Sequence, residues 1–251
     1  MLISANWLSR HVDLEGVDFV ALGDRFTLNV AELEDIHRVG GQAAACVVGH
    51  VLSVEHVEGT HLHLCQVDTG GEAPRQIICG APNIAAGQRV PVVLPGQTLG
   101  ELTVGEREVR GHLSQGMIAS ERELGLSEEH EGIMVLDGAP AAGTRLGDLF
   151  EIEDVLFEID NKSLTHRPDC WGHRGIAREI GALLGRPLLP MDDEVTYTAE
   201  TPITVSVEDA VACPRYLAVT LDGVTVAPSP LWMRMLLHRV GIRAINQVVD
   251  A

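Results

Sequence analysis

Hydrophobic and polar residues follow two different patterns along the chain, and the pattern changes near residue 40. In the first segment Leu8 and Val12 recur at helical spacing, and residues 17–22 indicate a second short helix. Gly40 and Gly41 then interrupt the helical spacing, which is typical of a boundary. The sequence therefore predicts a small, mainly helical opening segment.

Between residues 43 and 148, short apolar or alternating runs are separated by turns rich in glycine and proline. This punctuation is typical of short strands in an all-β module, and a length of about 100 residues suits a five-stranded OB barrel. One short helical insert is expected at "SERELGL". The runs expected as strands are "CVVGHVLSVEHV", "LHLCQVDTG", "RQIICG", "RVPVVLPG", "ELTVGEREVRG" and "GIMVL".

A clear amphipathic helix follows this β-rich region. Its apolar stripe repeats at helical spacing, and a glycine and a proline end it. We expect Asp169 to be its N-cap. The stripe consists of Ile176, Ile180, Leu183 and Leu184.

The last part of the chain is expected to start as strands, at "ITVSV" and "RYLAVTLDGVTV", after a linker near Met191. A helix is then expected from an N-cap at Ser229 and an N1 proline at Pro230 to just before Gly241. Some sixty residues are few for an independent core. We therefore expect the chain to end inside a domain.

Charge limits the partners that the chain can bind. The formal net charge is −18, and residues 41–149 hold six arginines against fourteen carboxylates. An acidic chain repels phosphate, so contact with nucleic acid requires a local basic patch. Residues 41–149 also contain no aromatic side chain on which a base could stack.

Cysteines and apolar runs indicate the compartment. The five cysteines are widely spaced and form no C-x-x-C pair, which argues against a disulfide framework or an all-cysteine zinc site. No run is long enough to cross a bilayer, and the first residues do not resemble a signal peptide. We expect a cytoplasmic protein with no membrane partner.

The stretch "THLHLCQVDTG" raises the question of a metal site, because His61, His63 and Cys65 would leave a strand on one face. Three ligands still need a fourth partner and supporting groups. We therefore favour a plain strand with Leu62 and Leu64 inward, and we predict no metal site.

A second cluster of polar residues lies in "THRPDCWGH". A metal site could use Cys170, but the capping pattern explains more of these residues. We expect Arg167 to pair with an acidic neighbour and Trp171 to pack. No nucleophile elbow, P-loop or G-x-G-x-x-G is present. We therefore predict no catalytic residue in this chain.

Five stretches, in order along the chain, resemble the bacterial phenylalanine–tRNA ligase beta-subunit family. The resemblance spans essentially the whole length of this chain. They are "CGAPNIAAGQRVPVVLPG", "RGHLSQGMIASERELGL", "RPDCWGHRGIAREI", "CPRYLA" and "PSPLWMRMLLHRVGIRAINQVVD".

The resemblance implies an α+β architecture: a small split helical or mixed domain with an inserted all-β OB barrel, followed by the start of an α/β editing-type (B3/B4-like) domain. The split domain would be 1–40 plus 150–190, the tRNA-binding OB insert 41–149, and the incomplete editing-type domain 197–251. It further implies ATP and magnesium as cofactors of the whole enzyme, bound outside this chain. Its implied partners are tRNA and an alpha subunit in an alpha2–beta2 heterotetramer, with no DNA.

In the family's "H-P-N-A-D-K-L-x-V-C-x-V-D-x-G" segment, which is not a metal site, His56, Leu62, Cys65 and Asp68 match. Val57 replaces the proline and His61 the lysine, which removes one expected phosphate contact.

The expected tRNA contacts lie in the OB insert. Arginine side chains would bind phosphate, and neighbouring hydroxyl and amide groups would bind phosphate or sugar. The opposing interpretation is that these arginines are solvated and paired with Glu106, Glu108, Glu121 or Glu123. The predicted tRNA-binding residues are Arg75, Arg89, Arg107, Arg110, Ser114 and Gln115.

The function predicted from this resemblance is binding without chemistry: tRNA contact and subunit assembly in ATP-dependent charging of tRNA with phenylalanine. Two alternatives stay open. One is a stand-alone tRNA-binding OB protein. The other is a protein-interaction module that binds no tRNA, which the acidic charge favours.

Overall fold

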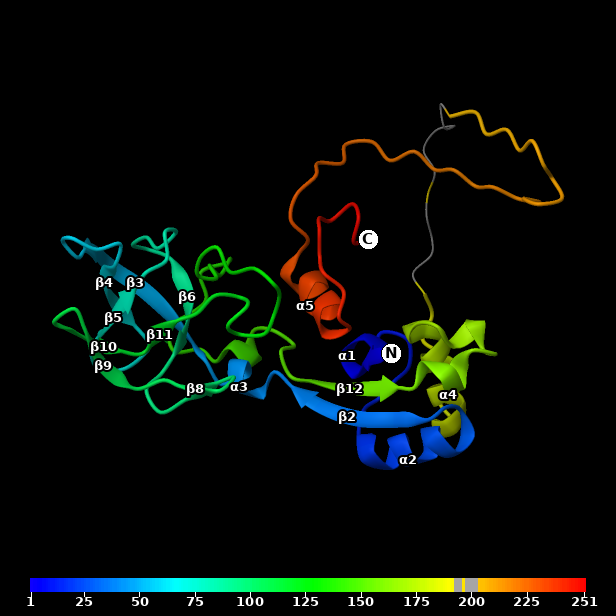
Figure 1. Ribbon diagram of the computed structural model, residues 1–251, viewed down its shortest axis with the longest axis horizontal. Coiled ribbons are helices and arrows are strands. Elements are labelled where there is room, and N and C mark those ends of the chain that lie inside the picture. Colours follow the sequence, from blue (N-terminus) through cyan, green and yellow to red (C-terminus); the bar gives the residue numbers. More distant parts are fainter. Residues whose placement is uncertain (192–195, 197–202) are drawn as a thin grey trace.

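The computed structural model describes residues 1–191, residue 196 and residues 203–251. A five-stranded, nearly closed antiparallel barrel lies beside a three-stranded sheet that carries helices, and helix α5 (Leu231–Arg239) lies over the region between them (Figure 1). The residues of the barrel lie in the sequence between two strands of that sheet, β2 (Leu33–Val39) and β12 (Asp154–Ile159). The predicted α+β class is confirmed. In the described part of the chain, no helix is long and apolar enough to span a bilayer.

The three-stranded sheet is antiparallel with β12 in its centre, in the order β1-β12-β2. Apolar side chains of two helices pack on one face of the sheet and form a core with Ile3, Phe157 and Ile159. The elements are β1 (Leu2–Ser4), α1 (Ala5–Leu8), α2 (Phe19–Asn29), β2 (Leu33–Val39), β12 (Asp154–Ile159) and α4 (His173–Leu184).

Strand β12 was not predicted, because Leu156 interrupts the polar and apolar alternation of its sequence DVLFEI. Five of its six residues are buried. Phe157 and Ile159 pack against the helices of the core, whereas Asp154 lies toward α5 and is reached by Arg239. A strand covered on both faces gives no period-2 signal.

The barrel has the strand order β11-β6-β3-β4-β5, all neighbours antiparallel. It confirms the expected OB-type barrel, and four of the six predicted runs form its main strands. Its interior is filled by Val51, Val67, Ile77, Val90 and other apolar residues. The strands are β3 (Val47–His56), β4 (His63–Asp68), β5 (Arg75–Cys79), β6 (Arg89–Val93) and β11 (Met117–Ile118).

Short elements surround the barrel. Four strands form two small hairpins, and a one-turn helix begins the barrel segment. They are α3 (Gly41–Ala44), β7 (Thr98–Leu99), β8 (Leu102–Thr103), β9 (Glu106–Val109) and β10 (His112–Gln115), with 3-10 turns at Leu146–Asp148, Asn161–Leu164 and Pro168–Cys170.

Two expectations within the barrel segment are wrong. "SERELGL" forms hydrogen-bonded turns instead of a helix, because Ser120 and Glu123 bond each other's backbone N–H groups and close a single turn. "GIMVL" is no strand. It contributes only isolated backbone bonds from Met134 and Leu136 to the barrel.

The orientation of strand β4 is opposite to the prediction. Cys65 and Val67 are fully buried in the barrel, while Leu62 and Leu64 are only partly buried. A cysteine behaves as a small apolar residue, so it fills the interior well. Burial raises the pKa of the Cys65 thiol to about 12, which keeps it protonated.

Helix α4 begins later than expected. Its N-cap is Gly172, and Asp169 lies in the preceding 3-10 turn, where it accepts hydrogen bonds from Arg167 and Arg178. The carboxylate oxygens of Asp169 are thus paired with two guanidinium groups and do not cap the helix. Gly185 ends the helix in the left-handed region, as expected.

The final segment differs most from expectation. Of the described residues, 203–229 form no β-ladder, so the two predicted strands are not present. A strand needs a partner to satisfy its backbone, and apolar alternation alone does not supply one. Helix α5 is present, but Pro230 is its N-cap and the Ser229 hydroxyl donates to Asp250.

Candidate nucleic-acid interface

Four of the six predicted tRNA-binding residues lie on one hairpin, formed by β9 and β10. Arg107 is on β9, Arg110 is in the turn, and Ser114 and Gln115 are on β10. Strand β10 runs beside β5, so Arg75 at the start of β5 belongs to the same side of the barrel.

The hairpin turn holds an exposed arginine in an unusual backbone conformation. Val109 pairs with His112, so the turn consists of Arg110 and Gly111. Their φ angles are 51° and 82°, both positive, as in a type I′ turn. Glycine, asparagine or aspartate normally occupies these positions. The guanidinium of Arg110 therefore stands at the tip of a tight, defined turn.

The predicted arginines are not neutralised by the glutamates that were candidate partners. In the described part of the chain, no ion pair within 4.0 Å involves any of these four arginines. Glu121 instead pairs with Arg234, and Glu123 bonds Ser120. Exposed Arg107 and Arg110 thus keep their charge available to an outside anion.

Arg89 is not brought to the hairpin. Its Nε donates to the carbonyl of Pro140 at 2.9 Å, which holds the half-buried side chain against a barrel loop. The neighbouring Val90 points into the barrel, so Arg89 points outward from β6. Arg75, on β5, lies opposite buried Val67 of the neighbouring strand β4, and Arg75 is itself half-buried.

Ser114 and Gln115 have a structural role that sequence analysis missed. The buried Ser114 hydroxyl accepts a hydrogen bond from the Ile78 N–H at 3.0 Å and donates to the Gly116 carbonyl at 3.2 Å. The Gln115 side-chain oxygen accepts from the Gln76 N–H at 3.4 Å. These two side chains satisfy backbone donors of edge strand β5, so they close the seam of the barrel. The Ser114 hydroxyl is already occupied and is not presented to a ligand.

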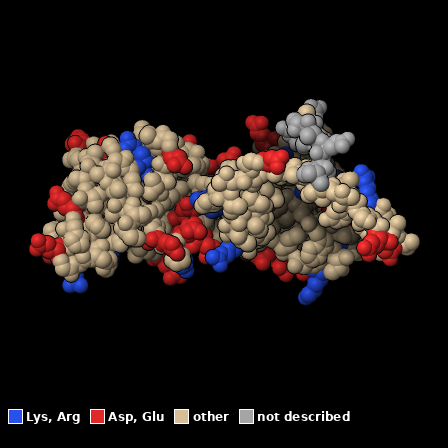
Figure 2. Space-filling view, turned by 90° about the horizontal axis from the view of Figure 1, so that it is seen from above, with Lys and Arg blue, Asp and Glu red and all other residues tan. Residues whose placement is uncertain are grey.

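The charges around the hairpin are mixed. Glu106 and Glu108 are exposed on β9 beside Arg107. The face seen in Figure 2 carries a few separate blue side chains and more red ones, several of which gather near the middle of the molecule, with no continuous basic stripe. Phosphate contact here would therefore rest on a few cations, and salt would weaken it strongly.

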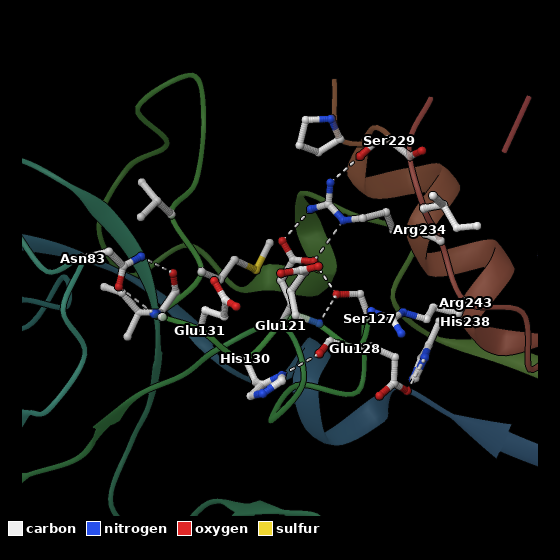
Figure 3. A pocket seen from close by; sticks show the side chains of 18 of the residues that line it. Asn83, Glu121, Ser127, Glu128, His130, Glu131, Ser229, Arg234, His238 and Arg243 are labelled. Atoms are coloured by element: carbon white, nitrogen blue, oxygen red, sulfur yellow. Dashed lines mark hydrogen bonds and ion pairs between the residues drawn. The ribbon is translucent and has the colours of Figure 1, made fainter. Parts of the chain in front are cut away.

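A cleft of about 430 Å³ was not foreseen from the sequence. It lies between a barrel loop over 121–135 and the segment around α5 (Figure 3). Glu121 receives two hydrogen bonds from Arg234, at 2.5 and 3.2 Å, and His238 lies 3.4 Å from Glu128. Two arginines and a histidine among the apolar residues of "LWMRMLLHR" were the signal that could have indicated acidic partners.

The "THRPDCWGH" cluster is organised by ion pairs. The predicted pairing of Arg167 is confirmed, with Asp169 at 2.9 Å and Glu179 at 2.6 Å. In the described part of the chain, Asp169, Cys170 and Glu179 form the one group with metal-ligand spacing. Arg167 and Arg178 hold the pKa of Asp169 well below its usual range. The carboxylates of Asp169 and Glu179 are already paired with these arginines, so the group is a poor site for a metal cation.

Two other residues of this cluster behave differently from each other. The expected packing of Trp171 is largely wrong, since the residue is 53% exposed and only its Nε1 donates to the Leu164 carbonyl. His173 is held inside: its Nε2 accepts from the Ser4 N–H at 3.0 Å, and its ring stacks on Trp7. Burial lowers the pKa of His173 to about 4, so the imidazole is neutral at pH 7.

Comparison with known proteins agrees with this geometry. The tRNA-binding domain family matches residues 46–145, which comprise the barrel and its hairpins, and the B3/4 domain family matches residues 212–251. The phenylalanine–tRNA ligase beta subunit of Desulfotalea psychrophila is 41% identical over all of this chain, and that of Nitratidesulfovibrio vulgaris is 43% identical. Over its whole length the chain is similar to part of the phenylalanine–tRNA ligase beta subunit.

The chain spans about a third of the length of these relatives, 31% of the first and 32% of the second. One solved structure, the C-terminal domain of Plasmodium vivax p43, matches 41% of this chain and 59% of its own at 21% identity and a TM-score of 0.31. That similarity is too low to support an argument. The similarity to phenylalanine–tRNA ligase rests on the beta-subunit relatives.

Proposed function

We propose that this chain is the N-terminal part of a phenylalanine–tRNA ligase beta subunit and that it contributes tRNA contact and subunit assembly to ATP-dependent charging of tRNA with phenylalanine. One observation supports this most strongly. The tRNA-binding family match covers the barrel, and the barrel presents Arg107 and Arg110 exposed and without ion pairs to the rest of the described chain.

The chemistry of the whole enzyme would be carried by parts outside this chain. In this proposal an alpha subunit completes an alpha2–beta2 assembly in the cytoplasm. ATP and magnesium bind to parts of that assembly outside this chain. The family of the relatives supports a ligase subunit and a partner subunit in general. The role of this chain is binding and positioning of tRNA, not bond formation.

The proposed division of labour follows three segments. A split domain of 1–40 plus 150–190 would carry the assembly surface, the OB insert of 41–149 would contact tRNA, and 197–251 would begin the editing-type domain. The family matches at 46–145 and 212–251 support the second and third segments.

A titration of tRNA at several salt concentrations tests this proposal. We expect the double variant Arg107→Ala/Arg110→Ala to bind more weakly and to reduce the slope of log K against log salt by about 0.9 for each lost phosphate contact. Arg178→Ala is the matched control, because Arg178 is exposed on α4 but pairs with Asp169. Equal slopes for the parent and the double variant would remove the hairpin from the interface.

The alternative of a protein-interaction module has two supporting observations, the excess of carboxylates and the absence of aromatic residues in 41–149. It predicts no salt-dependent tRNA binding by the parent chain at all. A purified alpha subunit would then bind the chain while tRNA would not. The stand-alone tRNA-binding protein is less well supported, since the relatives match beyond the barrel.

A further inference from the structure

The barrel and the three-stranded sheet are joined covalently by two chain crossings that lie side by side. The chain enters the barrel segment after Gly40 and returns to the sheet near Ile152. Gly40 has φ +86°, and a Cβ there would lie 2.0 Å from the Ile152 carbonyl oxygen. Two adjacent crossings resemble a hinge, and motion between units joined in this way is the ordinary expectation.

Helix α5 is anchored to the sheet at this hinge. Arg239 Nη1 lies 2.9 Å from Asp154 Oδ2, and the two side chains are 5% and 0% exposed. Arg239 also donates to the Ile152 carbonyl. Asp154 in turn accepts from the Ser4 hydroxyl at 2.6 Å and the Asn6 N–H at 3.0 Å, so β1 and α1 fix its position.

The same helix is anchored to the barrel by a second arginine. Arg234 binds Glu121 through two hydrogen bonds, and the side chains are only 18% and 13% exposed. Glu121 is held further by the Ser127 hydroxyl at 2.7 Å. Met235 of α5 is buried in the core that packs outside the barrel with Leu124 and Leu126.

The two anchors point in different directions. Positions 234 and 239 are five residues apart, which places them roughly 140° apart around a helix. One side of α5 therefore holds the barrel while another holds the sheet. Arg234 holds Glu121 in a bidentate pair, and Arg239 divides its guanidinium between the Asp154 carboxylate and the Ile152 carbonyl. Each arginine thus contacts at least two acceptor atoms and limits rotation of the helix.

We propose that α5 is a brace that holds the barrel and the three-stranded sheet in one fixed mutual orientation. Without it, the two crossings near Gly40 and Ile152 leave the barrel free to swing. This inference is independent of tRNA binding, because it concerns the orientation of the barrel and not what the barrel binds.

The experiment measures distances between spin labels on the 251-residue chain. The labelled positions are Glu55→Cys on the barrel, Asp24→Cys on α2 and Ile242→Cys after α5, all exposed. Half-exposed Cys213 is replaced by serine, and the other four cysteines are buried. Burial raises the pKa of Cys46 to about 11 and that of Cys65 to about 12, so these thiols do not compete for the label.

Two variants each release one anchor. In Glu121→Gln/Arg234→Gln, we expect the 55–24 distance distribution to broaden about twofold, while the 242–24 distribution keeps its width because α5 stays on the sheet. In Arg239→Gln, we expect the 242–24 distribution to broaden and the 242–55 distribution to stay narrow. Arg243→Gln is the matched control, since it removes an exposed charge from the same segment.

Circular dichroism establishes that each variant is folded. If Arg239→Gln unfolds, the Glu121→Gln/Arg234→Gln variant decides, because its contacts lie outside both sheets. An unchanged 55–24 distribution in that folded variant overturns the proposal. The tRNA titration of the hairpin variants does not bear on this result, so the two proposals fail separately.

Discussion

Two pairs of arginines in this chain have opposite surroundings. Arg234 and Arg239 on α5 are largely buried and each bind a carboxylate, whereas Arg107 and Arg110 on the β9–β10 hairpin are exposed and form no ion pair with any residue that the structure describes. A buried cation must have a partner, so the first pair is committed to architecture. An exposed cation is free to meet an outside phosphate. The same residue type thus has two uses, and burial decides between them.

The largest expected difference is in stability. We expect Arg239→Gln to lower the free energy of unfolding by about 3–5 kcal/mol, because it leaves the Asp154 carboxylate buried without its partner. Arg107→Gln should change it by no more than about 0.5 kcal/mol. Urea unfolding of both variants measures the difference, and similar values would break the comparison.

His173 extends the comparison to a group that avoids charge altogether. Its pKa is about 4 in the folded chain, mainly because of burial and also because of His11, and 6.5 is the ordinary value. Above pH 6.5 the group is neutral in both states and has no effect. As the pH falls below 6.5, the unfolded chain takes up the proton and the folded chain does not, so stability falls until about pH 4.

The expected loss from this residue is on the order of 2 kcal/mol. The measurement is the free energy of unfolding at about pH 7.5 and about pH 4.5, in the parent and in His173→Gln. Carboxylate ion pairs also weaken in acid, and the variant separates their effect. If the parent and the variant lose equal stability, His173 is not the group responsible.

Ser114 tests whether the hairpin also contains purely structural residues. Ser114→Ala removes the acceptor of the Ile78 N–H, and we expect a cost of about 1–2 kcal/mol in urea unfolding. The salt dependence of tRNA binding should stay that of the parent. Ser206→Ala, at an exposed position, is the control. A changed salt slope with unchanged stability would return Ser114 to the interface.

The smallest expected effect is at the turn. Asparagine tolerates the left-handed conformation better than arginine, so Arg110→Asn should raise the free energy of unfolding by about 0.5–1 kcal/mol. The same variant should bind tRNA more weakly. Opposite changes in stability and affinity would show that the arginine is kept for its charge. A variant that loses both would indicate a structural role.

The barrel was predictable because its strands alternate and its turns carry glycine. Strand β12 was not, since both of its faces are largely covered and Leu156 interrupts the alternation of its sequence DVLFEI. The orientation of β4 failed for a related reason: a histidine and a cysteine were taken as polar, although Cys65 is an interior residue.

Residues of the candidate site divide in the same way. The exposure of Arg107 and Arg110 follows from their place in a polar, glycine-containing stretch. The hydrogen bonds of Ser114 and Gln115 depend on which edge of the barrel lies beside β10. That depends on tertiary contacts between residues far apart in the sequence. The partners of Arg234 and Asp169 likewise lie far along the chain or compete with local caps, so local patterns do not reveal them.

The seam between β5 and β10 has a consequence for how the chain behaves in a crowded solution. An uncovered edge strand offers unpaired N–H groups to any other extended chain and so invites aggregation. Here the N–H groups of Gln76 and Ile78 are occupied by the side chains of Gln115 and Ser114, not by another backbone. Two polar side chains thus protect the edge, and losing them would turn a closed barrel into a template for intermolecular strand pairing.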